Sequence, residues 1–188
     1  MLNWDKINAK LEKEKIIIWG RRKEIDEDGN EITIDYVFTE LWGLMTKELS
    51  SKTLGILYAR FNMLPNDDEL LSVRVTYFNK NDFKTEGAQI IVDKYLIDYF
   101  DKEFECVLKD TLLLYMSEAN IDYKIFENAN AEKFEYVFFQ SDLFDLIKYT
   151  EDINILKASK DFYIISDDTD DKMLFIRTEP RILPEYLK

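Results

Sequence analysis

Residues 24–39 read EIDEDGNEITIDYVFT, and this stretch decides the fold prediction. Asp28-Gly29 lies between two extended segments, and an Asp-Gly pair supplies the positive φ that a tight hairpin turn requires. After the turn, Ile32, Ile34, Tyr36 and Phe38 alternate with Thr33, Asp35, Val37 and Thr39. Alternation with a period of two is typical of a half-buried β-strand, so the stretch predicts a β-hairpin.

The sequence around this hairpin predicts further strands. Ile16-Ile17-Ile18-Trp19 is typical of a short buried strand, and residues 71–77 alternate after the breaker at 64–68. Near the other end, 162–165 and 173–176 flank an acidic turn and predict a second hairpin. Strands are also expected at residues 123–126 and 134–139, followed by a short helix at 141–149.

Helical patterns complete the fold prediction. The strongest covers residues 93–119, where one stripe at 3.6 residues per turn contains Ile97, Phe100, Phe104, Leu108 and Tyr115. Shorter helices are expected at about 3–14 and 39–51. The sum is a single α+β domain over residues 1–188, with an antiparallel or mixed sheet packed against helices. Within it we expect a basic N-terminal element at 1–23 and an extended C-terminal tail at 178–188.

Composition supports a folded chain with a strong negative field. The 188 residues are 46% hydrophobic and 14% aromatic, and a disordered chain contains fewer apolar and aromatic side chains than this. The formal net charge is -13, from 25 basic and 38 acidic side chains. Residues 1–23 hold seven basic and three acidic groups, a net of +4, so the other 165 residues carry 18 basic and 35 acidic groups, a net of -17.

Several chemistries are disfavoured by the residue types. The chain has no histidine, the side chain most often used as a general base or metal ligand near neutral pH. Its one cysteine, Cys106, cannot form an intramolecular disulfide or a Cys/His zinc site, and we expect it to pack inside the long helix. Phosphate-binding glycine motifs and long apolar runs are absent from the sequence. We therefore expect a cytoplasmic protein that is not an enzyme, with no cofactor, metal or membrane partner.

Three acidic segments are the candidate partner-binding residues. Their carboxylates could contact a basic protein or bind a hard cation, but neither hairpin tip matches the calcium-loop template. Solvated turn residues are the structural alternative. The candidate residues are Asp26, Glu27, Asp28, Asp67, Asp68, Glu69, Asp167, Asp168, Asp170 and Asp171.

Charge, size and missing chemistry together favour an acidic binding protein. It would inhibit or neutralise a basic, nucleic-acid-handling protein, as a toxin-immunity or phage counter-defence protein does, with carboxylates imitating nucleic-acid phosphates. Direct nucleic-acid binding is disfavoured because phosphates would meet a negative body. Two alternatives stay open: a histidine-free, carboxylate- and Mg²⁺-dependent hydrolase or nuclease, and a scaffold or oligomer subunit.

Overall fold

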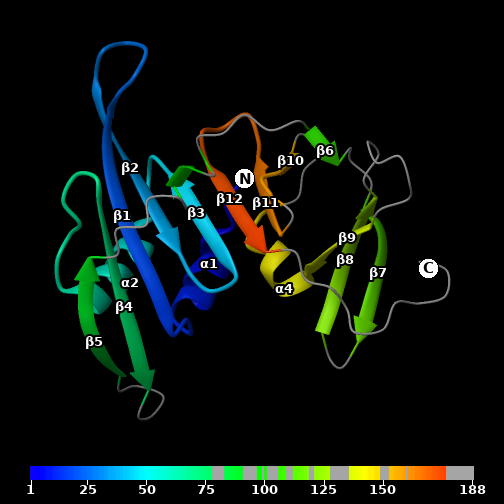
Figure 1. Ribbon diagram of the computed structural model, residues 1–188, viewed down its shortest axis with the longest axis horizontal. Coiled ribbons are helices and arrows are strands. Elements are labelled where there is room, and N and C mark those ends of the chain that lie inside the picture. Colours follow the sequence, from blue (N-terminus) through cyan, green and yellow to red (C-terminus); the bar gives the residue numbers. More distant parts are fainter. Residues whose placement is uncertain are drawn as a thin grey trace. The chain divides into compact units, whose positions relative to one another are not determined.

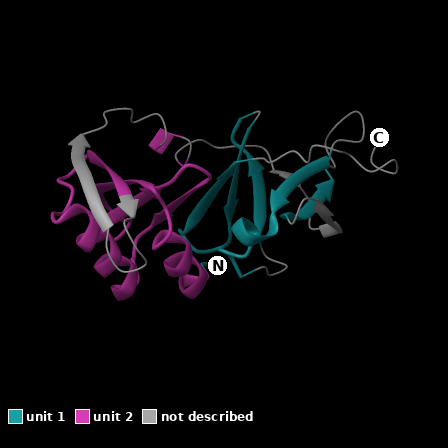
Figure 2. Cartoon of the chain, turned by 90° about the horizontal axis from the view of Figure 1, so that it is seen from below, with its two compact units in different colours: residues 1–2, 102–188 teal, residues 3–101 magenta. Residues whose placement is uncertain are grey.

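The structure is a computed structural model, and most of its described residues lie in strands. The described residues are 1–77, 83–90, 97, 98, 100, 106–108, 112–118, 121–127, 136–148, 153–159 and 161–176. The chain divides into two compact units, one of Asn3–Asp101 and one of Met1–Leu2 with Lys102–Lys188 (Figure 2). No helix in these described ranges has the length and apolar character needed to cross a bilayer.

A twisted antiparallel sheet forms the centre of the unit Asn3–Asp101 (Figure 1). The strand order within this unit is β5-β4-β1-β2-β3. The strands are β1 (Ile16–Ile25), β2 (Glu31–Phe38), β3 (Trp42–Thr46), β4 (Glu69–Tyr77) and β5 (Phe83–Ile90). The predicted hairpin at 24–39 and the predicted strands at 16–19 and 71–77 are thus confirmed, although β1 continues well past Trp19.

Both faces of this sheet are covered at its centre. Trp19 packs on Phe61 of helix α2 (Ser51–Phe61), with ring centroids 5.6 Å apart. On the opposite face, Phe38 and Tyr36 contact Phe100 at 5.8 and 6.1 Å. Residues 34–38 of β2 are all buried, so neither face of this strand is exposed at its centre. Alternation disappears where both sides of a strand are buried.

Helices α1 (Trp4–Leu11) and α2 of this unit are joined by polar contacts. Helix α1 confirms the helix expected near 3–14. Thr53 Oγ1 donates to Asn8 Oδ1 at 2.8 Å, and Arg60 Nη2 donates to the Glu12 carbonyl at 2.9 Å. Both contacts satisfy buried groups that would otherwise be costly to remove from water. The helix predicted at 39–51 is wrong, because β3 occupies Trp42–Thr46 and every residue of that strand is buried.

The second unit contains two small antiparallel sheets around an aromatic core. One has the order β12-β11-β10-β6, and the other β7-β8-β9. Phe139 contacts four other rings of the core: Phe126, Phe144, Tyr163 and Phe175. The elements are β6 (Cys106–Leu108), β7 (Leu112–Glu118), β8 (Ile121–Glu127), β9 (Tyr136–Gln140), α4 (Ser141–Phe144), β10 (Asn154–Lys157), β11 (Phe162–Ser166) and β12 (Lys172–Ile176). The predicted hairpin at 162–176 is confirmed.

The long helix predicted at 93–119, and with it the α+β class, is wrong: the described protein is mostly β. Of the described residues in this range, Ile97, Asp98 and Phe100 are helical, while Cys106–Leu108 and Leu112–Glu118 are strands. The error has a physical cause, because a short continuous apolar run fits a buried strand as well as a helix. Cys106 therefore lies in a strand. The single domain stays a prediction, and the tail at 178–188 lies outside the described residues.

Candidate docking site

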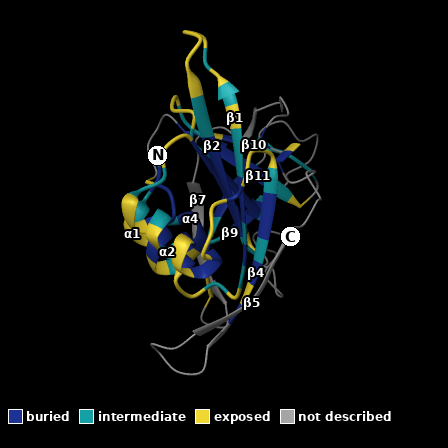
Figure 3. Cartoon of the chain, turned by 90° about the vertical axis from the view of Figure 1, so that its left-hand side faces the viewer, coloured by how far each residue is buried: buried dark blue, intermediate teal, exposed yellow. Residues whose placement is uncertain are grey.

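The hairpin of β1 and β2 extends beyond the strands that flank it. β4 pairs with β1 only as far as Arg21, and β3 pairs with β2 only from Asp35 onward. Residues 22–34 therefore form a two-stranded ribbon, which we call the arm. Figure 1 shows it projecting from its own sheet, and Figure 3 shows that its outer end is exposed. Such a ribbon leaves backbone groups on its edges without strand neighbours.

Local hydrogen bonds shape the tip of the arm. The Asp26 N–H donates to the Asn30 carbonyl at 2.9 Å, and the Gly29 N–H donates to the Asp26 carbonyl at 3.0 Å. Gly29 has φ 84°, as expected for the left-handed position of a three-residue hairpin loop. Asp26 Oδ1 also accepts from the backbone of Asn30 and Asp28 at 2.7 and 3.0 Å. These hydrogen bonds lower the pKa of Asp26, and the bond from the Asn30 N–H has the largest effect.

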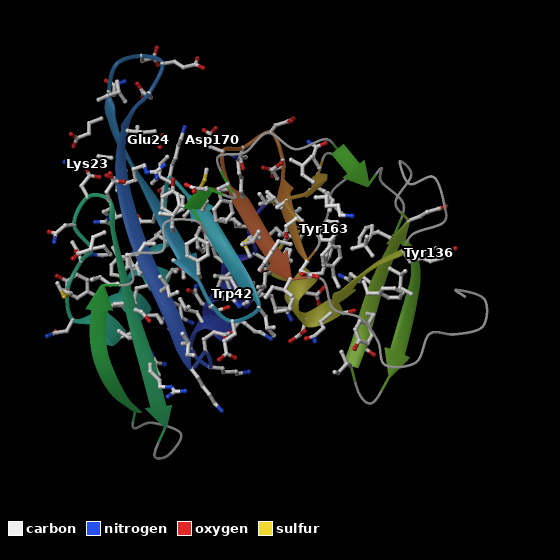
Figure 4. All side chains as sticks on the ribbon, in the orientation of Figure 1. Lys23, Glu24, Trp42, Tyr136, Tyr163 and Asp170 are labelled. Atoms are coloured by element: carbon white, nitrogen blue, oxygen red, sulfur yellow. The ribbon has the colours of Figure 1, made fainter. Side chains whose placement is uncertain are left out.

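The outer arm carries charge of one sign. Glu24, Asp26, Glu27, Asp28 and Glu31 lie within residues 24–31, which contain no cation. The Lys23 ammonium pairs with the Glu31 carboxylate at 2.6 Å, and the positive charge of Lys47 helps to lower the pKa of Asp26. Glu27 and Asp28 are exposed at the tip, and Figure 4 labels Lys23 and Glu24 lower on the arm.

One apolar side chain stands among these carboxylates. Ile25 is 69% exposed, more than any other large hydrophobic side chain that the structure describes. It lies directly opposite Glu31 in the β1–β2 register, so both side chains point to the same face of the arm. A single exposed isoleucine is ordinary on a protein surface. Here it is combined with a projecting ribbon and a dense negative charge.

The second predicted acidic segment is bound by the chain itself. Asp67 Oδ1 accepts from the Lys23 N–H at 2.6 Å, and the Asp68 N–H donates to the Arg21 carbonyl at 2.8 Å. The Asp68 carboxylate also pairs with Arg22 at 3.2 Å. Glu69 accepts from the backbone N–H and side-chain amide of Asn66 at 2.8 and 2.9 Å. These residues therefore hold the loop before β4 against the edge of β1.

A buried carboxylate at the base of the arm was not among the predicted site residues. Asp35 is 5% exposed and accepts a hydrogen bond from Trp19 Nε1 at 2.9 Å. Arg21 holds both of its oxygens, through Nε at 3.1 Å and Nη2 at 3.2 Å. Burial raises the pKa of Asp35, and the bonds from Trp19 and Arg21 oppose that rise. The sequence signal was an aspartate in a strand opposite a Trp-Gly-Arg run.

The third predicted segment belongs to the other unit, at the tip of the β11–β12 hairpin. Asp167 Oδ1 accepts from the Thr169 N–H and hydroxyl at 2.9 and 2.5 Å, and Oδ2 contacts the Met1 amino group at 2.9 Å. Burial opposes these contacts, but they prevail and lower the pKa of Asp167. Asp168 and Asp170 are exposed, and Asp171 is half-buried. Figure 4 labels Asp170 near the start of β12.

The described residues bring together no group of three or more His, Cys, Asp or Glu side chains that could hold a metal ion. The two predicted segments in Asn3–Asp101 are linked through β1, since Arg22, the partner of Asp68, lies four residues before Asp26. At about 3.3 Å per residue, that separation is about 13 Å along the strand.

Comparison of the chain with family models, with curated proteins and with solved structures finds no match.

Proposed function

We propose that this chain is an acidic, non-enzymatic binding protein that inhibits or neutralises a basic protein, and that the arm is its docking element. The observation that carries the proposal is the combination of five carboxylates with a largely exposed isoleucine on a ribbon that extends beyond its pairing with β4 and β3. Burying one isoleucine contributes about 1.5–3 kcal/mol. The carboxylates would select for a cationic surface around it.

The charge of the whole chain supports the same partner class. A net charge of -13 attracts a cationic protein over a distance of about one Debye length and repels nucleic acid. Proteins that bind nucleic acid present the complementary basic surface. The role we propose is accordingly that of an immunity or counter-defence protein, in which carboxylates occupy the positions that phosphates would take.

The carboxylates differ in how available they are for this role. Glu27 and Asp28 are exposed at the arm tip, whereas Asp67 and Asp68 are engaged by Lys23 and Arg22. We therefore assign the main contribution to the arm tip and a smaller one to the loop before β4. Asp168 and Asp170, at the other hairpin, provide a matched comparison because the same number of exposed carboxylates can be removed there.

The test uses a panel of purified nucleic-acid-binding proteins with pI above about 9. Binding is measured by biolayer interferometry over a range of salt concentrations with the wild type, with Glu27→Gln/Asp28→Asn and with Asp168→Asn/Asp170→Asn. Both variants change the net charge equally. We expect the arm variant to lower the association rate for a bound panel member by about tenfold, and the control variant to change it far less.

Three results would contradict the proposal. Equal weakening by both variants would show attraction to net charge without a docking element. Binding that is insensitive to salt would exclude the electrostatic selection on which the partner class depends. If no panel member binds more tightly than a neutral protein, the chain is not a binder of basic proteins.

A further inference from the structure

We infer that the basic partner of the arm supplies an extended segment that adds as a third strand to the β2 edge of the arm, beside Glu31 and Thr33. This inference rests on the proposed function and specifies how the arm binds. Strand addition is a common way of recognising extended peptides, in which backbone hydrogen bonds give affinity and alternate side chains give specificity.

The register of the hairpin shows which backbone groups are available. The Asp26 N–H bonds to Asn30, so alternate residues of β1 before Asp26, namely Glu24 and Arg22, point their backbone groups toward β2. The backbone groups of Lys23 point away from β2, and the hydrogen bond from the Lys23 N–H to Asp67 Oδ1 agrees with this direction. The same alternation turns the backbone groups of Glu31 and Thr33, the residues opposite Ile25 and Lys23, away from β1.

β3 leaves this edge of β2 open beyond Asp35. The last residue pair is Asp35 with Thr46, and β3 ends there. The Thr46 hydroxyl accepts from the Glu48 N–H at 3.1 Å and lies 3.3 Å from the Glu48 carbonyl oxygen, forming a local turn. Within the described residues, Glu31 and Thr33 have no strand neighbour on that side.

The opposite edge of the arm is closed at the same level. Asp67 Oδ1 accepts a hydrogen bond from the outward N–H of Lys23, and the Asp68 N–H donates to the Arg21 carbonyl. Side chains that cover outward backbone groups are a common protection of edge strands. The two edges therefore differ at this level: Asp67 and Asp68 bond to the outward groups of Lys23 and Arg21 on β1, whereas in the part of the chain that the structure describes no strand pairs with β2 along Glu31 and Thr33.

Charge decides which strand fits the open edge. A strand beside β2 would place one of its side chains next to Glu31, so lysine or arginine is favoured at that position. A second copy of this chain would instead bring two arms with five carboxylates each together. Like charges on neighbouring strands are destabilising, so we assign the edge to a basic partner and not to self-association.

The test uses an end-blocked peptide of alternating lysine and threonine, and the same peptide with every backbone nitrogen methylated. Methylation keeps every charge and removes every backbone donor. Binding is followed by NMR shifts and by amide exchange at Glu31 and Thr33 in the full chain. We expect the unmethylated peptide alone to bind and to slow exchange at both amides, because strand pairing gives them carbonyl partners.

Thr33→Pro is the matched variant of the protein. It removes the outward N–H and changes neither the net charge nor any hydrogen bond within the arm, because the Thr33 N–H points away from β1. We expect it to weaken peptide binding about tenfold, while Thr33→Val, which keeps the N–H, leaves affinity within twofold. Unchanged circular dichroism and thermal midpoint show that the proline variant is folded.

The other outcomes overturn the inference in distinguishable ways. One such outcome is that the methylated peptide binds the wild type, and the unmethylated peptide binds Thr33→Pro, as tightly as the unmethylated peptide binds the wild type. Side-chain charge alone would then hold the peptide, and the proposed function would survive without strand addition. If neither peptide shifts or protects Glu31 and Thr33, strand addition is excluded, whatever the protein panel shows. If the protein dimerises and Thr33→Pro abolishes dimerisation, the occupant of the edge is a second copy.

Discussion

The two acidic hairpin tips are alike in sequence and differ in structure. In both, the first aspartate of the acidic run builds the turn: Asp26 accepts from the Asp28 N–H, and Asp167 accepts from the Thr169 N–H. The β11–β12 tip is additionally fixed by the Met1 amino group. The β1–β2 tip instead ends an arm that extends past both neighbouring strands and exposes Ile25.

The number of acidic residues in a segment therefore does not define a docking surface. Part of each acidic run is used for turn geometry, and the Asp67–Glu69 segment is used to hold a loop against β1. Three features distinguish the arm: it projects from its sheet, β3 does not pair with its outer β2 edge, and Ile25 is exposed among its carboxylates.

The largest effect is expected at the base of the arm, from Asp35→Ala. The substitution leaves the buried Trp19 N–H without an acceptor and Arg21 without its carboxylate. Removing one partner of a buried charged pair costs about 3 kcal/mol of unfolding free energy. Urea denaturation measures the loss, with Asp170→Ala at the other hairpin as an exposed control. A loss below about 0.5 kcal/mol would show that Asp35 does not support the arm.

Binding should depend on Ile25 more than on any other exposed isoleucine. Ile25→Ser removes the apolar anchor, and we expect affinity for a basic partner to fall about tenfold, since a buried isoleucine contributes at least about 1.5 kcal/mol. Ile121→Ser is the matched control, because Ile121 is 38% exposed and belongs to the other unit. Equal affinities of the two variants, measured at one salt concentration, would remove Ile25 from the docking site.

Two carboxylates should give opposite pH dependences of stability. Burial raises the pKa of Asp35 above its ordinary value of 3.8, so the part of the stability that is linked to its protonation is complete below that pH and is lost as pH rises through its folded pKa. The pKa of Asp167 is lowered, so its contribution is present above 3.8 and is lost as pH falls.

Urea unfolding across this pH range checks both signs. Relative to Asp35→Asn, the stability of the wild type should decrease as pH rises above 3.8. Relative to Asp167→Asn, it should increase as pH rises from below 3.8. Parallel curves for the wild type and both variants would mean that neither carboxylate changes its proton affinity on folding.

Local sequence was sufficient for the hairpins and for helix α1, and it was insufficient at residues 39–51 and 93–119, where helices were predicted and strands are found. Gly29 has the positive φ that the Asp-Gly pair predicts, and Phe162–Ser166 pairs with Lys172–Ile176 as the second hairpin requires. Residues 112–114 are three consecutive leucines, which fit one face of a helix or a buried strand equally well. That choice is made by pairing with β8, which a local window does not contain.

The candidate site could be predicted in part, for the same reason. Acidic turn residues are visible in sequence, so the arm tip was among the predicted partner-binding residues. Asp35 was missed because its burial depends on Trp19 and Arg21 of the neighbouring strand. The engagement of Asp67 and Asp68 likewise depends on residues 21–23, more than forty positions earlier. The prediction that all three segments bind a partner stays a prediction.

The smallest effect is expected from Asp68→Asn, which separates the charge of the loop before β4 from its backbone role. Asp68 has φ 57°, a conformation that asparagine also tolerates, and its pair with Arg22 is exposed to solvent. Exposed pairs contribute little, so the unfolding free energy should change by less than about 0.5 kcal/mol. Thermal and urea unfolding measure the change. A loss above about 1.5 kcal/mol would show that the Arg22 contact, and not the Asp68 N–H bond to Arg21, holds the loop on β1.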